Sequence, residues 1–142
     1  MTLYLDTSSL VKLYVDESGS DEVRQDLSDA TAVATSAVAY PEARAAFAKR
    51  RRERAVTPSV YRSIMRDFDA DWPAYLVVEP TMGLCRQAGD LAERYGLRGF
   101  DSVHLASYLE VAGETGALNA RFSSFDRRLN RAATTATKGM TR

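Results

Sequence analysis

Four acidic residues, far apart in the chain, are the side chains best suited to chemistry. Asp6 directly follows a short apolar run with the pattern of a buried strand, and Asp126 follows a second, weaker run. Asp101 lies in the first turn of a strongly apolar helical segment. In an open α/β sheet, ligands bind outside the carboxyl ends of the strands, where Asp6 and Asp126 are expected. Taken singly, each aspartate is better explained as a helix cap or as a charge near a helix dipole.

Glu42 has no such simple explanation. The residues three and four positions away from it on the predicted helix are small and apolar: Val38, Ala39, Ala45 and Ala46. An acid on that face is expected to point inward, and burying a lone carboxylate is costly unless it is neutralised, paired or bound to a metal. A structural ion pair with Arg98 or another arginine is the alternative to a functional site.

Several carboxylates that converge at one sheet edge repel each other, and a divalent cation is the usual resolution. Mg²⁺ or Mn²⁺ suits a set of oxygen ligands. Such an ion also aligns a phosphodiester and activates water for in-line attack. His104 is the only histidine, so a two-histidine mechanism of nucleic-acid cleavage has no second partner. His104 follows Asp101 by three residues and could support the site, but a packed, hydrogen-bonded core histidine is the simpler expectation.

Motifs of other protein classes are absent. Asp6 lacks the second aspartate, two residues later, that an aspartyl-phosphate phosphatase needs. The chain has no phosphate loop, dinucleotide fingerprint or nucleophile elbow. Cys85 is the only cysteine, which excludes an intrachain disulfide and a cysteine-rich zinc site. No apolar run approaches the roughly 20 residues that span a bilayer, and the N-terminus lacks a signal-peptide pattern, so we expect a cytoplasmic protein.

The elements that must position these residues alternate along the chain. Short apolar runs predict strands at residues 2–5, 31–35, 75–78 and 117–123, with helical patterns between them. This alternation predicts an α/β fold with a parallel sheet covered on both faces. The length of 142 residues fits one domain. The last helix is expected to end near Ala133, and the polar residues 134–142 are expected to form a frayed tail.

The net charge does not indicate a nucleic-acid-binding protein, because the 19 basic and 19 acidic residues give a formal charge of zero. Its distribution is more informative, since Lys49–Arg54 is a basic block at a predicted helix end. The block could contact phosphate, or it could be a solvated helix end whose cations suit the helix dipole. Contacts with another protein chain are a further possibility for the same helix end.

With the four acids placed, the sequence resembles the PIN-domain family, and within it the VapC-type toxins of bacterial toxin–antitoxin pairs. Four segments carry the resemblance, which spans residues 1 to about 133. They are YLDTSSLVKLY from Tyr4, TSAVAYPE from Thr35, FDSVHLA from Phe100 and SSFDRRL from Ser123. Each is weak alone, but their order and their placement on the expected elements make the set specific.

The resemblance implies a function and roles for the site residues. It implies a ribonuclease that uses Mg²⁺, with Mn²⁺ as a substitute, and that leaves a 5′-phosphate and a 3′-hydroxyl. The metal would be held, directly or through water, by Asp6, Asp101 and Asp126. Glu42 would complete the acidic cluster and help to orient the attacking water. Ser8 and Ser124 would hydrogen-bond the carboxylates or the scissile phosphate.

The resemblance also implies a three-layer α/β/α domain over residues 1–133, a homodimer, and a small antitoxin that lies across the acidic groove. The sheet would have four parallel strands, or five if the family's additional strand follows the last helix. Thr134–Gly139 has little apolar content for that strand. The fourth strand is weak, so Asp126 depends most on the resemblance. A PIN nuclease of RNA processing or DNA repair, and a degenerate PIN module that only binds, are the alternatives.

Overall fold

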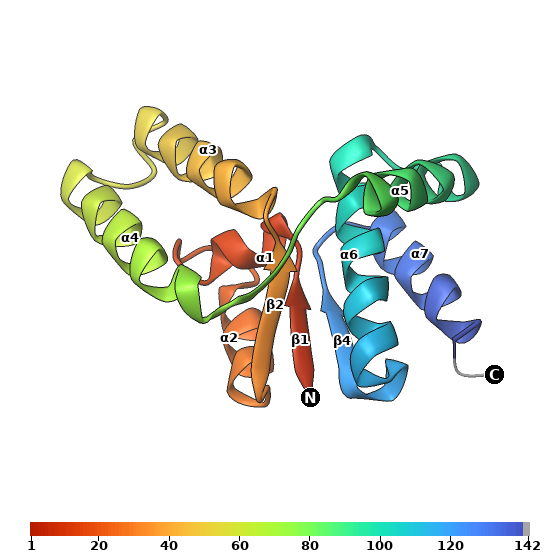
Figure 1. The fold of residues 1–142 in the computed structure, drawn as a ribbon. Coiled ribbons are helices and arrows are strands. Elements are labelled where there is room, and N and C mark those ends of the chain that lie inside the picture. The colour runs from red at the N-terminus through yellow and green to blue at the C-terminus, as the bar shows by residue number, and fades with distance from the viewer. Residues whose placement is uncertain (141–142) are drawn as a thin grey trace.

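The sheet is built around β1 (Thr2–Leu5), whose four residues are all buried. A strand buried on both faces needs helices on both sides. β1 pairs in parallel with β2 (Ala32–Ser36) on one side and with β4 (Ala120–Ser123) on the other, and β2 pairs in parallel with β3 (Leu76–Val78). The strand order is therefore β3-β2-β1-β4. The computed structural model describes residues 1–140, and the carboxyl ends of the strands lie at the top of Figure 1.

Alternate side chains of β1 enter two separate cores. Leu3 and Leu5 pack in the first core, whereas Tyr4 packs in the second. The helices whose residues build the first core are α1 (Thr7–Lys12), α2 (Ser20–Ser28), α3 (Ala39–Arg52) and α4 (Pro58–Asp71). Those of the second core are α5 (Met82–Tyr95), α6 (Gly99–Thr115) and α7 (Arg127–Lys138). Figure 1 shows the two groups on opposite sides of the sheet, which confirms the predicted three-layer α/β/α fold.

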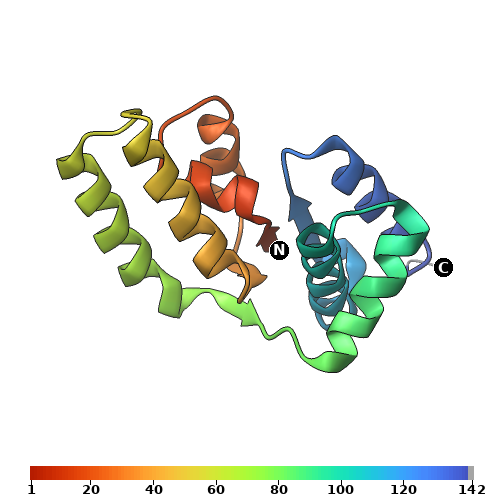
Figure 2. The same ribbon diagram turned by 90° about the horizontal axis from the view of Figure 1, so that it is seen from above.

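Helices α3 and α4 form an antiparallel pair that projects beside the sheet (Figure 2). A cluster of aromatic rings holds this pair to the first core, with ring centroids between 5.2 and 6.0 Å apart: Tyr14, Tyr40, Phe47, Phe68 and Trp72. The short 3₁₀ turn η1 (Trp72–Ala74) then leads into β3. Because the cluster fixes α3, it also fixes the direction in which the first turn of α3 faces the sheet edge.

The C-terminal part differs from the sequence-based expectation. Helix α7 continues to Lys138 instead of ending near Ala133, and in the added turn the hydroxyls of Thr134 and Thr137 donate to backbone carbonyls of the preceding turn, which satisfies these polar groups within the helix. Residues 134–138 are therefore helical and do not form a frayed tail, while residues 141–142 lie outside the described part. No fifth strand follows α7 within residues 1–140. The assignment of residues 1–133 to one domain stays a prediction.

The fourth strand is shorter than predicted. Residues Ala117–Asn119 form the 3₁₀ turn η2, in which Asn119 donates a side-chain hydrogen bond to the Thr115 carbonyl, and β4 begins only at Ala120. Its pairing with β1 nevertheless places Ser123 next to Leu5, so both strands end at the same edge. Within residues 1–140 no helix is both long enough and apolar enough to cross a membrane.

Candidate active site

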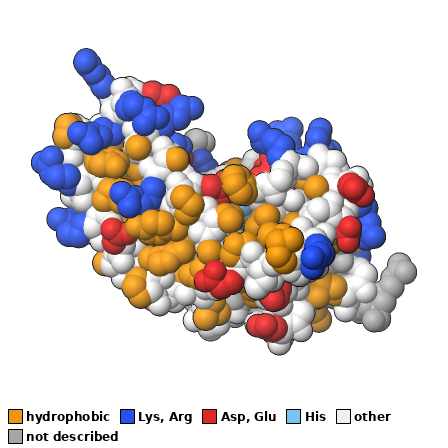
Figure 3. Space-filling model, turned by 45° about the horizontal axis from the view of Figure 1, so that its top comes forward, with side chains coloured by type: hydrophobic (Ala, Val, Ile, Leu, Met, Phe, Trp, Pro, Cys, Tyr) orange, Lys and Arg blue, Asp and Glu red, His pale blue; other side chains and the backbone are white. Residues whose placement is uncertain are grey.

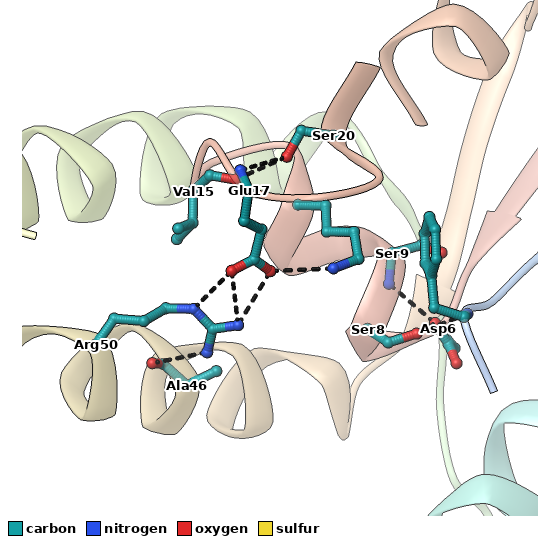
Figure 4. Close-up of polar contacts among 10 residues, drawn as sticks. Asp6, Ser8, Ser9, Val15, Glu17, Ser20, Ala46 and Arg50 are labelled. Atoms are coloured by element: carbon teal, nitrogen blue, oxygen red, sulfur yellow. Dashed lines mark hydrogen bonds and ion pairs between the residues drawn. The ribbon is translucent and has the colours of Figure 1, made fainter. Parts of the chain in front are cut away.

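Asp6 is fixed at the point where β1 passes into α1. It caps α1, and its Oδ1 atom accepts hydrogen bonds from the Ser9 backbone N–H at 3.0 Å and from the Ser8 hydroxyl at 2.6 Å (Figure 4). Its own backbone N–H donates to the Ser123 carbonyl at 3.1 Å, which ties it to β4. The side chain is only 4% exposed. Among residues 1–140, both hydrogen bonds to this carboxylate go to Oδ1, so Oδ2 is the oxygen available to a ligand.

Glu42 lies in the first turn of α3 and points inward, as predicted, but its partners are not arginines. Its Oε1 atom accepts a 2.6 Å hydrogen bond from the Thr7 hydroxyl and lies 3.1 Å from Nε2 of His104. Burial alone would raise the pKa of Glu42, but the hydrogen bonds from His104 and Thr7 outweigh it and lower the pKa below its ordinary value. Glu42 is thus held as an anion with a side chain that is 29% exposed.

His104 is the buried, hydrogen-bonded histidine that the sequence predicted, and it also reaches the site. Its side chain is 3% exposed, on α6. Nδ1 lies 2.9 Å from the Tyr4 hydroxyl, and Nε2 lies 3.0 Å from the Thr7 hydroxyl oxygen. The histidine therefore links the core beneath the sheet to the carboxylate of Glu42.

Asp101 and Asp126 face each other across Arg98. Asp101 lies in the first turn of α6, with Oδ2 3.4 Å from Nε of Arg98, and Asp126 caps α7, with Oδ2 3.9 Å from Nη2 of Arg98. Burial raises the pKa of Asp101 above its ordinary value. The guanidinium of Arg98 opposes this rise, and the negative charges of Asp126 and Asp6 add to it. The fold therefore brings Asp6, Asp101 and Asp126 within electrostatic range of one another.

Two adjoining pockets are lined by Glu42, Asp101 and Asp126, whereas Asp6 is in the lining of neither. A pocket of about 650 Å³ is lined by Glu42 and Asp101 together with residues 98–100 and Val103. A second pocket, of about 330 Å³, is lined by Asp101 and Asp126 with residues 96–98 and Arg128. Figure 3 shows acidic side chains in the hollow between two raised parts of the molecule, with Lys and Arg on both rims. A phosphodiester could enter this hollow from solvent.

The donor set fits a hard divalent cation. Mg²⁺ and Mn²⁺ prefer carboxylate oxygens and keep several waters, so the carboxylates need not converge on one point. Within the described residues, no three acidic, histidine or cysteine side chains are close enough to form a ready metal cluster. Burial, with the nearby negative charges of Asp126 and Asp6 added to it, raises the pKa of Asp101, and a bound cation would favour its ionised form. The metal roles of Asp6, Asp101 and Asp126 stay predictions.

The two predicted serines differ in what they contact. Ser8 donates to the Asp6 carboxylate and accepts a 3.1 Å hydrogen bond from the Phe125 backbone N–H, so it links Asp6 to the loop of Asp126. The Ser124 hydroxyl instead accepts from the Asp126 backbone N–H at 3.0 Å and shapes the turn. Their roles toward a phosphate stay predictions.

Sequence reasoning missed Thr7 as the hydroxyl that bridges Glu42 and His104, and Tyr4 as the partner of His104. Thr7 directly follows Asp6, but only the tertiary fold shows that it faces α3 and α6. Arg98 was considered as a partner of Glu42, whereas its ion pairs are with Asp101 and Asp126. The spacing of three residues between Arg98 and Asp101 at a helix start was the available signal.

Comparison with known proteins agrees with this geometry. The family profile of the PIN domain matches residues 3–134. Two proteins of Mycobacterium tuberculosis, named Ribonuclease VapC45 and Ribonuclease VapC49, are each 40% identical to this chain over 131 residues. The alignment covers 92% of this chain and 88% of each relative. The chain therefore belongs to the PIN-domain family.

Proposed function

We propose that this chain is a metal-dependent endoribonuclease and the toxin of a toxin–antitoxin pair. Its relatives are named ribonucleases of the VapC type, and they are similar to it over almost its whole length. The observation that carries the proposal is the placement of Asp6, Asp101 and Asp126 at the carboxyl edge of the sheet, where Asp101 lines one pocket with Asp126 and the adjoining pocket with Glu42. Such a set of acids is unfavourable without a cation and favourable with one.

Asp6, Asp101 and Asp126 would hold Mg²⁺, or Mn²⁺ as a substitute. When bound, the cation would neutralise charge on the phosphodiester and make a water more acidic. Glu42, kept ionised by its hydrogen bonds, would orient the attacking water and accept its proton. Attack by water on phosphorus then leaves a 5′-phosphate on one fragment and a 3′-hydroxyl on the other. Ser8 would keep Asp6 in place, and Ser124 would keep the turn of Asp126 in place.

The partners follow from the same surface. RNA would be attracted by the Lys and Arg side chains on the rims of the hollow, whose floor is acidic (Figure 3). A small antitoxin would silence the enzyme by covering the hollow, and a basic segment of it would suit the acids there. We further propose that the chain acts in the cytoplasm as a homodimer.

The test is cleavage of a panel of short single-stranded RNAs by the purified chain, with Mg²⁺ or with EDTA. We expect cleavage only with the metal, products with 5′-phosphates, and loss of at least about 100-fold in rate for Asp6→Asn and Asp101→Asn. Asp90→Asn, an exposed α5 residue away from the site, is the matched control and should keep full activity. Full activity of both site variants, or cleavage in EDTA, would refute the proposal.

The toxin role needs a second experiment. Expression of the wild-type chain in a bacterial host should arrest growth, and co-expression of the small protein encoded beside its gene should restore growth. Expression of the Asp101→Asn variant should not arrest growth. Unimpaired growth with an enzyme that is active in vitro would leave a nuclease but remove the toxin role.

A further inference from the structure

A row of polar side chains, two of them buried, lies beneath Glu42 and takes no part in the proposed metal site. It consists of Tyr4 on β1, His104 on α6 and Thr7 on α1. Tyr4 is fully buried, and His104 is nearly so. Burying polar groups away from water is costly, and apolar residues of similar size would fill the same core. Packing alone therefore does not explain why these three residues are polar.

The hydrogen bonds of this row show which atom of His104 donates toward Glu42. The Thr7 hydroxyl donates its one proton to Oε1 of Glu42, and a carboxylate oxygen can only accept. Nε2 of His104 lies within hydrogen-bond distance of both the Thr7 oxygen and Oε1, so Nε2 must be a donor. On the other side of the ring, Nδ1 lies 2.9 Å from the Tyr4 hydroxyl.

The Nε2 proton of His104 then faces the site. Nε2 lies 3.0 Å from the Thr7 oxygen and 3.1 Å from Oε1 of Glu42, while the Thr7 hydroxyl donates to the same Oε1 at 2.6 Å. Two donors from two different helices thus converge on one oxygen of the carboxylate. Among the described residues, Oε2 accepts no hydrogen bond, and Glu42 lines the larger pocket together with Asp101.

We propose that His104, which contacts Tyr4 through Nδ1 and donates through Nε2, acts with Thr7 as a pair of positioning residues that fix the Glu42 carboxylate for the attacking water. This inference rests on the proposed function. Glutamate has several rotatable bonds, so a carboxylate held by one oxygen keeps its other oxygen aimed at a constant place. A role of this kind affects the rate of the chemical step and leaves RNA binding almost unchanged.

Two substitutions of His104 separate positioning from packing. Glutamine can place an N–H near the position of Nε2, whereas asparagine reaches only the position of Nδ1. Both remove the ring from the core, so both should lower the melting temperature to a similar degree. We expect kcat to fall about 10- to 100-fold in His104→Asn. His104→Gln should recover most of that loss, and KM for RNA should change less than about threefold in either.

Thr7 offers a matched pair that leaves the core histidine intact. Thr7→Val removes the hydroxyl at nearly constant volume and should lower kcat about 10-fold, and Thr7→Ser restores the donor and should restore the rate. Equal kcat for His104→Asn and His104→Gln, together with equal kcat for the two Thr7 variants, would overturn the inference. If Asp6→Asn is inactive in the same assay, the proposed function survives that result.

NMR spectroscopy tests the protonation of His104 independently of RNA cleavage. His104 is the only histidine, so long-range ¹H–¹⁵N NMR of the untagged protein reports on one imidazole. We expect a proton on Nε2, and a change in the ring signals in Tyr4→Phe. A ring without a proton on Nε2 in the wild-type chain would overturn the inference, whatever the assay of RNA cleavage shows.

Discussion

The two sides of the acidic hollow are built differently. On one side, Glu42 is held by hydroxyl and imidazole donors from α1 and α6, and its pKa is lowered. On the other side, Asp101 and Asp126 share only the side chain of Arg98, which is 86% exposed and stands 3.4 and 3.9 Å away, and the pKa of Asp101 is raised. Fixed hydrogen-bond donors satisfy the first carboxylate, whereas the second group lacks a fixed counter-charge. We therefore expect the proposed ion to bind beside the aspartates and not beside Glu42.

The largest expected effect is on kcat, and Mg²⁺ affinity should distinguish substitutions on the two sides of the hollow. Glu42→Gln should lower kcat about 100- to 10,000-fold, as loss of a general base does, and should change the dissociation constant for Mg²⁺ less than about threefold. Asp101→Asn should lower kcat and also weaken Mg²⁺ binding more than about 10-fold. Calorimetric titration with Mg²⁺ together with single-turnover kinetics measures both quantities. Equal loss of Mg²⁺ affinity in the two variants would contradict the claim that the ion binds beside the aspartates and not beside Glu42.

How much of this arrangement the sequence predicts depends on the range of the interactions. Asp6 and Asp101 could be placed because a strand end or a helix start is visible locally, whereas Asp126 follows a weak strand and depended most on the family resemblance. The inward orientation of Glu42 followed from the apolar residues on its helical face. Its partners did not, because the contact with His104 joins α3 to α6, and no local pattern encodes how two helices meet.

The same distinction explains the errors at the C-terminus. The end of α7 was placed too early because Thr134 and Thr137 interrupt the apolar pattern, while their hydroxyl bonds to the helix backbone are invisible to it. The apolar pattern of each segment also does not predict the strand order β3-β2-β1-β4, because that order depends on which strand edges pair.

The next prediction concerns the turn that carries Asp126, on the aspartate side of the hollow. Gly19 has φ +93°, and a Cβ there would lie 2.6 Å from the ring of Phe125, the neighbour of Asp126. Gly19→Ala should therefore lower the free energy of unfolding by about 1–2 kcal/mol and weaken Mg²⁺ binding, because the ring must move. Gly89→Ala is the control, since a Cβ on that exposed helical glycine meets nothing within 4 Å.

Gly89→Ala should raise the free energy of unfolding by about 0.5–1 kcal/mol, because alanine suits a helix better than glycine does. Urea denaturation of both variants gives the two values. Unchanged stability in Gly19→Ala would show that the contact between Gly19 and Phe125 does not hold the turn.

The dependence of stability on pH should have opposite signs on the two sides. Glu42, with its lowered pKa, contributes stability that is present above its unfolded pKa and is lost as pH falls through the folded pKa. Asp101, with its raised pKa, contributes stability that is fully present below its unfolded pKa and is lost as pH rises through the folded pKa. Each substitution should therefore shift the unfolding free energy in its own direction.

In EDTA at neutral pH, Glu42→Gln should cost about 1 kcal/mol, since it weakens charge-assisted hydrogen bonds. Asp101→Asn should cost nothing or stabilise the fold, and both differences from wild type should shrink towards pH 3. Thermal and urea unfolding from pH 3 to pH 8 measure this. Destabilisation of the same size by Asp101→Asn at neutral pH would contradict the assignment.

The smallest expected effect belongs to Arg98. Its exposed ion pairs are worth no more than about 1 kcal/mol, so Arg98→Ala should tighten Mg²⁺ binding at most about fivefold, by removing a competing cation. Arg94→Ala, which removes the same charge from an exposed position on α5, should change the affinity less. Weaker Mg²⁺ binding in Arg98→Ala would show that the guanidinium helps the ion.

A crystal structure of the chain with Mn²⁺, with an anomalous difference map collected at the manganese edge, tests the central claim most directly. The account predicts one or more anomalous peaks beside Asp6, Asp101 and Asp126, with Arg98 displaced from between the aspartates. It also predicts that Glu42 keeps its hydrogen bonds to Thr7 and His104. A peak held by Glu42 and His104, or no peak near the three aspartates at saturating Mn²⁺, would contradict it.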